Sequence, residues 1–363
     1  MKKDWEVKKL GEVCELSAGG DLPKNDFSEI KTNKQTIPIY ANGEKNNGLF
    51  GFTSIAKVTK PSITISARGT IGFSVKRLES FFPIVRLIVV TPKNLQNLDL
   101  SYLDYSIKTI DFKHSGTSIP QLTVPMIKDY KIPIPPLPEQ KRIVSVLDKC
   151  FTAINKAKAN AEKNLKNAKE LFESYLHGVF ESGKWEKKKL NQISKNLDSK
   201  RIPITKNKRN SGNIPYYGAS GIVDYVADYI FDDNLLCISE DGANLLARTY
   251  PIAFSITGKT WVNNHAHVLK FPNLTIQKFV EIYINSIKID EYVSGMAQPK
   301  LNQAMLNKIP IPIPSLPEQQ SIVRQLDSLK AKTQKLETVY NKKISDLEEL
   351  KKSILQEAFR GQI

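Results

Sequence analysis

Ile132-Pro-Ile-Pro-Pro-Leu-Pro-Glu-Gln140 occurs a second time in the chain, with one substitution, as Ile311-Pro-Ile-Pro-Ser-Leu-Pro-Glu-Gln319. Around the two copies, residues 115–148 align without gaps to residues 294–327 at a constant offset of 179 residues, and 17 of the 34 positions are identical. Internal repetition at one fixed offset is the signature of a chain built from copies of one structural unit. We therefore expect two equivalent halves.

The starts of the halves also match, since Trp5-Glu-Val-Lys-Lys-Leu10 resembles Trp185-Glu-Lys-Lys-Lys-Leu190. Between these anchors the halves diverge, and short echoes survive, such as Ser66 with Gly69 and Ser239 with Gly242. Similar frames with dissimilar interiors indicate one task that is performed on two different targets.

The prolines of the repeated stretch predict an extended segment that leads into a helix. Proline fixes φ, lacks an amide donor and disfavours helix in the preceding residue. Pro138 and Pro317 suit the first helical turn, where the missing N–H costs nothing, and the acidic residues after them suit the positive end of the helix dipole. We expect long helices over residues 137–180 and 316–359, each roughly 65 Å long at 1.5 Å per residue.

Apolar residues recur along both predicted helices in steps of three and four. In the second helix Thr333, Tyr340, Leu347 and Ile354 lie seven residues apart. Such a seam predicts a partner helix. A self-paired coiled coil with no further role remains an alternative, and an antiparallel pair would place the two variable domains at opposite ends.

The variable part of each half carries short β-branched and aromatic runs between Gly, Asn and Pro residues, which predicts short strands and turns. We expect an α+β domain with a twisted, partly barrel-like sheet. The expected strands cover residues 62–65, 84–90, 235–238 and 267–271, and the expected helices cover residues 100–112 and 276–292.

The net charge of +16 favours a polyanionic partner. Each phosphate that Lys or Arg neutralises releases condensed counterions, so basic proteins gain affinity for nucleic acid. Lysine is also common on solvated helix faces, and the charge alone therefore leaves a solvated surface as the alternative.

Several other classes of protein are disfavoured. The most apolar stretch, Phe81 to Val90, contains Pro83 and Arg86 and is shorter than the roughly 20 residues of a membrane span. No apolar segment follows the basic N-terminus, so a secretory signal is not expected. The three cysteines lie far apart, which predicts neither disulfides nor a thiolate zinc site. We expect a cytoplasmic protein without a membrane partner.

The sequence offers few signals of enzyme chemistry. The stretch from Ala253 to Thr260 resembles a phosphate-binding loop, but alanine replaces its first glycine. His265 and His267 would share one face of a strand, yet no cluster of carboxylates or cysteines accompanies them. The adenine methyltransferase motif Asn-Pro-Pro-aromatic and a glycine-rich cofactor loop are not found in the sequence. We expect no catalytic residues, no metal and no cofactor.

The order of variable region, Ile-Pro-Ile-Pro-x-Leu-Pro-Glu-Gln and long helix, given twice, resembles the specificity subunits of type I restriction–modification systems. The resemblance covers essentially the whole chain and includes the Trp5 and Trp185 openings. It implies a non-catalytic subunit that reads the two halves of a split site on double-stranded DNA. Its implied partners are two methyltransferase subunits, which dock on the helices, and restriction/translocase subunits, which join the larger complex.

The resemblance implies an α+β fold with two globular α/β target-recognition domains, separated by two long antiparallel coiled-coil helices in a pseudo-twofold internal repeat. The expected boundaries are residues 1–136 for the first recognition domain, 137–183 for the first spacer helix, 184–315 for the second recognition domain and 316–363 for the second spacer helix.

Polar and basic residues of the variable loops are the candidates for DNA contacts, because base edges and phosphates are bound by Arg, Lys, Asn, Gln and His side chains. For each of them the alternative is an ordinary solvated surface residue. In the first half the candidates are Lys45, Asn46, Arg68, Lys76, Arg77, Lys113, His114 and Gln121. In the second half they are Lys200, Arg201, Lys208, Arg209, Arg248, Lys259 and Lys300.

Two other functions stay open at this point. The chain could be a DNA-modifying enzyme in its own right, either a nuclease or a methyltransferase. It could also be a coiled-coil scaffold protein with no DNA function.

Overall fold

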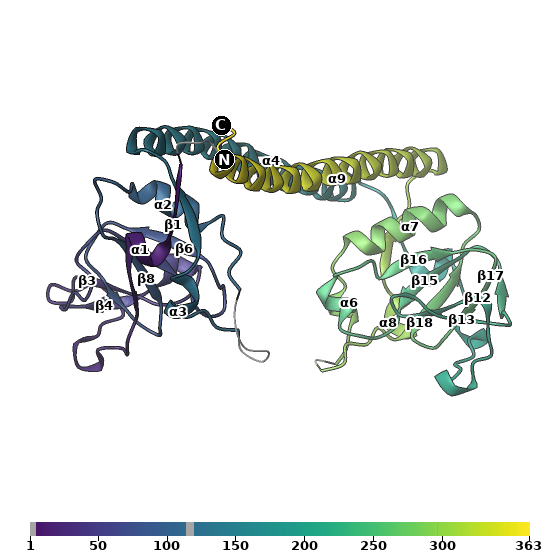
Figure 1. Cartoon of the computed structure of the whole chain (residues 1–363). Coiled ribbons are helices and arrows are strands. Elements are labelled where there is room, and N and C mark those ends of the chain that lie inside the picture. Colours follow the sequence, from purple (N-terminus) through teal and green to yellow (C-terminus); the bar gives the residue numbers. More distant parts are fainter. Residues whose placement is uncertain (1–4, 114–119, 296) are drawn as a thin grey trace. The chain divides into compact units, whose positions relative to one another are not determined.

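The computed structural model describes residues 5–113, 120–295 and 297–363, and these form two compact units. The first unit takes the chain up to Glu162 together with Lys342–Ile363, and the second takes Lys163–Asn341. Each unit holds one globular α+β part and a segment of each of two long helices (Figure 1). The candidate residue His114 lies outside the described residues.

Two sheets and a separate strand pair build the globular part of the first unit. One sheet has the order β2-β8-β5-β6 with antiparallel neighbours, and the other has the order β4-β3-β7, in which β3 and β7 run parallel. The pair β1-β9 is antiparallel. The strands are β1 Glu6–Lys9, β2 Cys14–Ala18, β3 Ile37–Tyr40, β4 Leu49–Thr53, β5 Ser62–Ile65, β6 Ser74–Arg77, β7 Phe82–Pro83, β8 Ile88–Pro92 and β9 Lys131–Ile134.

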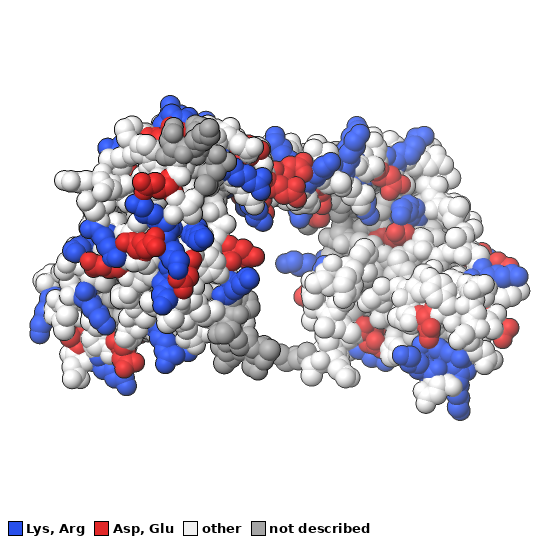
Figure 2. All heavy atoms as spheres, viewed as in Figure 1, with Lys and Arg blue, Asp and Glu red and all other residues white. Residues whose placement is uncertain are grey.

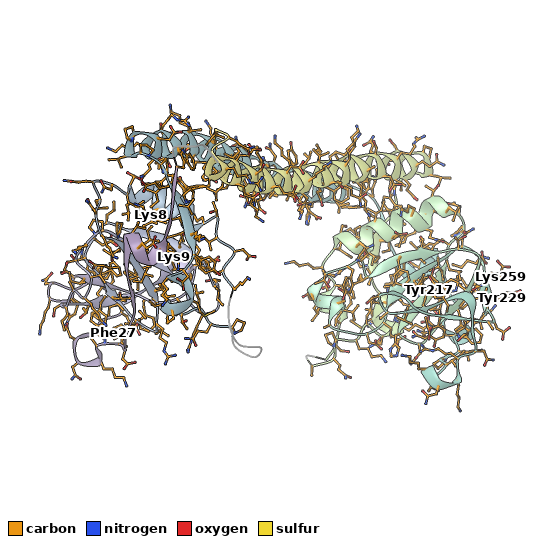
Figure 3. All side chains as sticks on the ribbon, in the orientation of Figure 1. Lys8, Lys9, Phe27, Tyr217, Tyr229 and Lys259 are labelled. Carbon is orange, nitrogen blue, oxygen red and sulfur yellow. The ribbon has the colours of Figure 1, made fainter. Side chains whose placement is uncertain are left out.

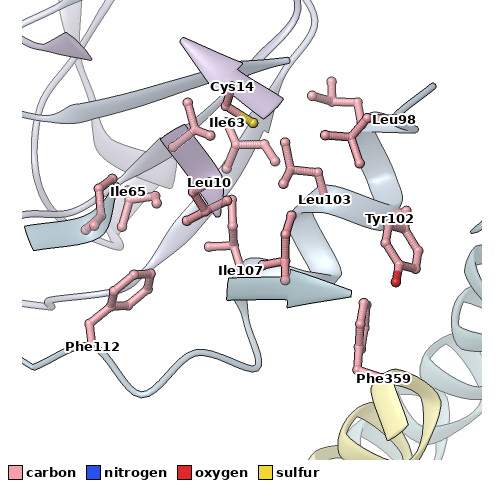
Figure 4. Packing of buried hydrophobic residues seen from close by; sticks show 14 of the residues in the cluster. Leu10, Cys14, Ile63, Ile65, Leu98, Tyr102, Leu103, Ile107, Phe112 and Phe359 are labelled. Atoms are coloured by element: carbon pink, nitrogen blue, oxygen red, sulfur yellow. The ribbon is translucent and has the colours of Figure 1, made fainter. Parts of the chain in front are cut away.

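The first unit's core lies between the four-stranded sheet and its helices. Strand β5 is buried along its whole length, which fits a central strand covered on both faces. Figure 4 shows Ile63, Ile65 and Leu103 packed in this core. The short helices are α1 Leu10–Val13, α2 Leu100–Ile107 and α3 Val124–Ile127, with 3-10 turns η1 Lys24–Asp26 and η2 Lys45–Gly48.

The second unit repeats this topology with one added strand, β14, which pairs with β17. Its sheets have the orders β11-β18-β15-β16 and β13-β12-β17-β14, and β10 pairs with β19 as β1 pairs with β9. The strands are β10 Lys187–Lys189, β11 Lys195–Asn196, β12 Ser211–Gly218, β13 Gly221–Val226, β14 Phe231–Asp232, β15 Leu235–Ser239, β16 Ala253–Ile256, β17 Lys259–Val262, β18 Ala266–Lys270 and β19 Pro310–Pro312. The structure thus confirms the internal repeat.

The helices of the second unit complete the correspondence, with one addition, α6. They are α5 Leu190–Ile193, α6 Asn244–Ala247, α7 Leu274–Ser286 and α8 Gln303–Leu306, with 3-10 turns η3 Asp198–Lys200, η4 Lys206–Lys208 and η5 Asp290–Tyr292. Val280 and Ile284 of α7 are fully buried in this unit's own core.

The predicted long helices are α4 Leu137–Ser182 and α9 Leu316–Arg360. They run antiparallel within each unit. In the first unit Arg142 of α4 donates to Ile363 O at 2.6 Å, and Lys158 of α4 binds Glu348 of α9 at 2.6 Å. The residue numbers of the partners therefore decrease as the residue numbers along α4 increase. In the second unit Leu176 of α4 packs with Leu326 of α9. No helix within the described residues is both long and apolar enough to cross a membrane.

A buried glutamine lies at the start of each long helix, and in the first unit it fastens the helix to the globular part. Gln140 is fully buried, and its side-chain amide donates to Asn97 O at 2.9 Å and to Pro135 O at 2.8 Å. Its Oε1 accepts from the backbone N–H of Asp99 at 2.9 Å, and Asp99 is the N-cap of α2. Gln319, its counterpart, donates to Pro314 O at 2.9 Å. In the first unit the Pro-Glu-Gln sequence therefore encodes a joint as well as a helix start.

Some local predictions were wrong. The helix expected over residues 100–112 ends at Ile107, and Phe112 instead packs edge-on against Tyr130. The helix expected over residues 276–292 ends at Ser286, because Ile287 turns to extended geometry. The strands of each half also form separate sheets instead of one barrel-like sheet.

The strand expected over residues 84–90 was wrong in its first half. It begins only at Ile88, because Val85 and Arg86 adopt left-handed backbone conformations with φ of 52° and 59°. A left-handed residue breaks the extended geometry that a strand requires.

Replacing Gln140 with Ala should lower the free energy of unfolding of the first unit by about 2 to 5 kcal/mol. The change removes three hydrogen bonds and leaves buried backbone groups without partners, each of which costs about 1–3 kcal/mol. Denaturant unfolding followed by circular dichroism measures the change.

Gln96→Ala serves as the control, because Gln96 is an exposed residue of the same unit. Equal stabilities for the two variants would contradict the role of Gln140 as a joint.

Candidate nucleic-acid interface

In the first unit, loops at the ends of three strands meet at one edge of the two sheets. One loop follows β3, a second follows β5, and a third joins β7 to β8. The segment at Gln121 joins them, because Leu122 N donates to Ala67 O at 2.9 Å. We call this group the first loop cluster, made of Asn42–Gly43, Ser66–Gly69, Val85–Arg86 and Gln121.

Asn42 ties the first loop cluster together. Its side-chain amide donates to Val85 O at 2.7 Å, and its Oδ1 accepts from Ala67 N at 2.7 Å. The next residue adds a link, since Gly43 N donates to the Ser66 hydroxyl at 3.1 Å. One asparagine therefore fixes the positions of the residues that precede Arg68 and Arg86.

The second unit forms the same arrangement at equivalent positions. The register shows it, because Ile65 pairs with Ile88 in the first unit as Ile238 pairs with His267 in the second. Counting from these pairs gives the counterparts Glu240–Gly242 and Asn264–His265. Ala219–Ser220 follow from the pairing of Tyr217 with Val262, which matches that of Tyr40 with Pro83. Lys300 follows because Leu301 N donates to Glu240 O as Leu122 N donates to Ala67 O. We call them the second loop cluster: Ala219–Ser220, Glu240–Gly242, Asn264–His265 and Lys300.

Hydrogen bonds between the loops fix the second loop cluster too. Glu240 N donates to His265 O at 2.8 Å, and Leu301 N donates to Glu240 O at 2.8 Å. The Ser239 hydroxyl donates to Ala219 O. The ring of His265 lies 2.8 Å from a carboxylate oxygen of Asp241.

A buried ionic network lies beneath the second loop cluster. His267 is 1% exposed, and its ring nitrogens face Asp198 at 2.6 Å and Leu301 O at 2.7 Å. Both neighbours of the ring are hydrogen-bond acceptors. Arg201 binds Glu240 at 2.7 Å and Ala266 O at 2.8 Å, so the network connects strand β18 with the cluster.

The network keeps its carboxyl groups ionised. Burial acts to raise the pKa of Asp198, but hydrogen bonds from His267 and from Val268 N and the charge of His267 outweigh it, and the pKa lies below its ordinary value. Burial likewise opposes ionisation of Glu240, yet the Arg201 hydrogen bond and the charges of His267 and Arg201 lower its pKa.

The two clusters thus share a frame and differ in charge. At matching positions the first carries Ala67, Arg68 and Arg86, and the second carries Glu240, Asp241 and His265. Beneath the first, Ile88 takes the place of His267. Equivalent loops with different donors and acceptors would recognise different chemical patterns.

The predicted residues of the first half divide by exposure. Arg77 is buried and lies over the Tyr40 ring at 3.4 Å from its centroid. Arg68 and Gln121 are half-buried, and the Arg68 guanidinium donates to Gln121 at 2.9 Å within the first loop cluster. The exposed ones are Lys45, Asn46, Lys76 and Lys113.

In the second half the arginines already have partners inside the unit. Arg201 belongs to the ionic network, Arg209 binds Asp224 at 2.8 Å, and Arg248 donates to Ile287 O at 2.8 Å. The exposed lysines are Lys200, Lys208, Lys259 and Lys300. Lys300 alone of these lies in the second loop cluster.

Two views show the exposed lysines of this unit. Basic side chains gather at its lower edge in Figure 2, and the exposed Lys200, Lys206 and Lys208 belong to the turns η3 and η4. Figure 3 shows Lys259 beside Tyr229, with its ammonium 4.8 Å from the ring centroid.

Sequence reasoning missed Asn42, Arg86, Asp241 and His265 as members of the clusters. The signal that could have found Arg86 is the alignment of the halves, which sets the segment before β8 against the segment before β18. His265 was noticed for a different reason, as half of a His-x-His pair, and its partner proves to be the half-buried Asp241 rather than His267.

The motifs that resembled enzyme signals have structural roles. Gly258 lies in a turn between strands β16 and β17, where a phosphate-binding loop would lead into a helix. Within the described residues no group of three or more His, Cys, Asp and Glu side chains could hold a metal ion. The three cysteines are free, and burial raises the pKa of the Cys14 thiol to about 12.

The lowered pKa of Asp198 predicts a pH dependence of stability. A carboxyl whose pKa is lower in the folded state stabilises the fold above its unfolded pKa, near 3.8 for Asp, and this contribution is lost as pH falls through the folded value. Asp198→Asn should therefore destabilise the protein at pH 7, and the difference from the unsubstituted protein should shrink below about pH 4.

Thermal unfolding at pH 7, 5, 4 and 3 measures this difference, with Asp228→Asn at an exposed position as the control. A difference that stays constant down to pH 3 would show that the charge of Asp198 contributes nothing.

Comparison with known proteins gives a consistent result. The family model described as the type I restriction modification DNA specificity domain matches residues 2–164 and 182–346, once in each half. The specificity subunit of the type I restriction enzyme EcoDI of Escherichia coli is 23% identical over 99% of this chain and 89% of its own length. A Haemophilus influenzae protein named as a type I restriction enzyme specificity subunit is 37% identical over 160 residues, which are 44% of this chain.

The chain spans about half the length of the curated relatives that it matches first, 41% of the Haemophilus protein and 54% of a Mycoplasma pneumoniae specificity subunit.

Solved structures share the fold. The HsdS subunit from Thermoanaerobacter tengcongensis has a TM-score of 0.63 and 17% identity, and the match covers 100% of this chain and 98% of that one. A chain from a structure of type I R-M complex assembly and conformational transition has a TM-score of 0.76 at 17% identity, over 100% and 99%. With the family model matching most of its length, the chain belongs to the family of type I restriction–modification DNA specificity proteins.

Proposed function

We propose that this chain is the DNA-recognition subunit of a type I restriction–modification complex and that each half reads one part of a split DNA site. The observation that carries this proposal is the pair of loop clusters, which have one frame and different side chains. An asymmetric, bipartite DNA site requires two recognition domains that share a scaffold and differ in the chemistry of their side chains.

The charge of the chain supports the same function. A net charge of +16 supplies the salt-dependent attraction to phosphates that gives DNA-binding proteins most of their non-specific affinity. Phosphate contacts position a protein on the duplex, and base contacts supply the sequence preference. We assign phosphate contacts to the exposed lysines, and base contacts to the two loop clusters.

Of the sequence-predicted residues, the exposed ones fit phosphate contacts: Lys45, Lys76, Lys113, Lys200, Lys208 and Lys259. Arg68, Gln121 and Lys300 fit base contacts by their place in the clusters. The remaining arginines, Arg77, Arg201, Arg209 and Arg248, fit a supporting role, since each has partners within its own unit. Asn46 belongs to the exposed loop that follows Asn42.

The long helices would serve as the spacer. In this division residues 1–136 and 184–315 are the recognition domains, and residues 137–183 and 316–363 are the spacer helices. Helices of 46 and 45 residues would keep the two readers at one distance and leave the base pairs between them unread.

We assign the chemistry to partners. The chain would be non-catalytic and would dock two methyltransferase subunits and the restriction/translocase subunits, next to the DNA in the cytoplasm. The name of the Escherichia coli relative, a specificity subunit of a restriction enzyme, supports this division of labour.

Selection of bound duplexes from a randomised pool tests the proposal. The chain, purified with its methyltransferase partner, should enrich one sequence made of two short defined blocks with an unspecified gap of fixed length. Binding at physiological salt that enriches no sequence would refute it. Incubation of the chain alone with DNA, Mg²⁺ and a methyl donor should give no turnover, and cleavage or methylation there would favour a stand-alone enzyme.

Replacing Lys200, Lys206 and Lys208 together with Ala should weaken DNA binding to the same extent for all sequences. Each lost phosphate contact should reduce the slope of log affinity against log salt concentration by about 0.9. Fluorescence anisotropy at several salt concentrations measures the slope.

A variant with Ala at the exposed α4 positions Lys163, Lys166 and Lys169 loses the same charge and should keep a slope near that of the unsubstituted protein. If both variants change the slope equally, the net positive charge of the chain accounts for DNA binding, and the lysines of η3 and η4 make no specific phosphate contacts.

A further inference from the structure

We propose that Arg86 determines specificity in the first half by reading a guanine base of its half-site. This inference rests on the proposed DNA-recognition function and adds to it a named residue and a named base. Four features of the structure support it, and each concerns the short turn between β7 and β8.

The first feature is the backbone of the turn. Val85 and Arg86 are consecutive residues other than glycine at φ of 52° and 59°. The left-handed conformation costs L-residues roughly 1–2 kcal/mol each, and it is least suited to a β-branched residue such as valine. Conformations of this kind persist where surrounding structure enforces them, and they concentrate at functional sites.

The second feature is the number of bonds that enforce the turn. Val85 N donates to Gly20 O at 2.8 Å, and Arg86 N donates to Gly19 O at 3.1 Å. Asn42 holds Val85 O from the other side. Hydrogen bonds to Gly19 and Gly20 and from Asn42 therefore fix the backbone at Arg86.

The third feature is the freedom of the Arg86 side chain. The residue is exposed, and within the described part of the chain its guanidinium has no hydrogen-bond or ion-pair partner. Arg68, which lies in the same cluster, is half-buried and bound to Gln121. Of these two arginines in the first loop cluster, Arg86 is the one whose guanidinium is available to a ligand.

The fourth feature is the counterpart of Arg86 in the second half. His265 takes the same register position, two residues before His267, which pairs with Ile238 as Ile88 pairs with Ile65, and Asp241 binds its ring. The same location on the frame thus carries a free guanidinium in one half and a histidine–carboxylate pair in the other. A position that differs in this way can distinguish the two half-sites.

The chemistry of the guanidinium selects guanine. Its planar pair of N–H donors matches the N7 and O6 acceptors that guanine presents in the major groove, and this bidentate contact is the commonest specific one between proteins and DNA. A guanidinium can also bind a phosphate with two hydrogen bonds. The charge that phosphate contacts require is, however, already supplied by exposed lysines such as Lys45. A fixed backbone that carries an unpaired guanidinium fits the geometric requirements of a base contact.

The test compares the unsubstituted chain, Arg86→Ala and Arg86→Lys, each purified with the methyltransferase partner and used to select duplexes from a randomised pool. Arg86→Ala should lose preference for guanine at one position of one block, with discrimination there falling about 10-fold or more, while the other block stays unchanged. Arg86→Lys should also relax this position, because a point charge cannot reproduce the bidentate fork. Arg142→Ala removes an exposed arginine of the same unit and should leave the selected sequence as it was.

Two results would overturn the assignment. One is an unchanged guanine preference in both Arg86 variants. The other is a uniform loss of affinity over all sequences with a smaller salt slope, which would make Arg86 a phosphate contact. If Arg86→Ala melts at a much lower temperature than the unsubstituted chain, Arg86→Lys alone decides between these results. Absence of any sequence preference in the unsubstituted complex would instead refute the proposed function itself.

Discussion

The attachment of each long helix to its own globular part is the constraint on which the rest of the structure depends. In the first unit the attachment is the fully buried Gln140, which binds the extended segment before the helix and the N-cap of α2. The proline-rich strand before it cannot continue as helix, so the change from strand to helix has one possible place. Without a fixed joint, a long helix would transmit no defined position to the loops at the far edge of the sheets.

The position of the loop clusters depends on the sheets, and the sheets are tied to the long helices by the joint. The buried strands β5 and β15 place their ends at one sheet edge in each unit, and hydrogen bonds between the loops then fix the side chains that follow. The frame is the same in both units, but its supports differ. Asn42 holds the first cluster with neutral hydrogen bonds, whereas a buried ionic network around His267 and Glu240 supports the second.

The sequence was informative wherever the signal was local or repeated. Prolines and glutamates at fixed places predicted where both long helices begin, and the constant offset predicted two equivalent units. It failed where tertiary contacts decide. The run from Ile84 to Val90 has the composition of a strand, yet the hydrogen bonds of Gly19, Gly20 and Asn42 force Val85 and Arg86 out of extended geometry. Such failures of local rules are expected at functional sites. The sequence also could not show that Arg77 lies over a ring and that Arg201 binds a carboxylate inside the fold, and their contacts with DNA stay a prediction.

The central claim is that the helices set the distance between two separate readers, and a change in helix length tests it most directly. An insertion of seven residues in α4, matched by seven in α9, keeps the apolar seam in register and should add about 10 Å. The modified protein, with its methyltransferase partner, should select the same two sequence blocks with the gap widened by about three base pairs, at 3.4 Å each. A folded protein that selects the blocks at the original gap would contradict the account.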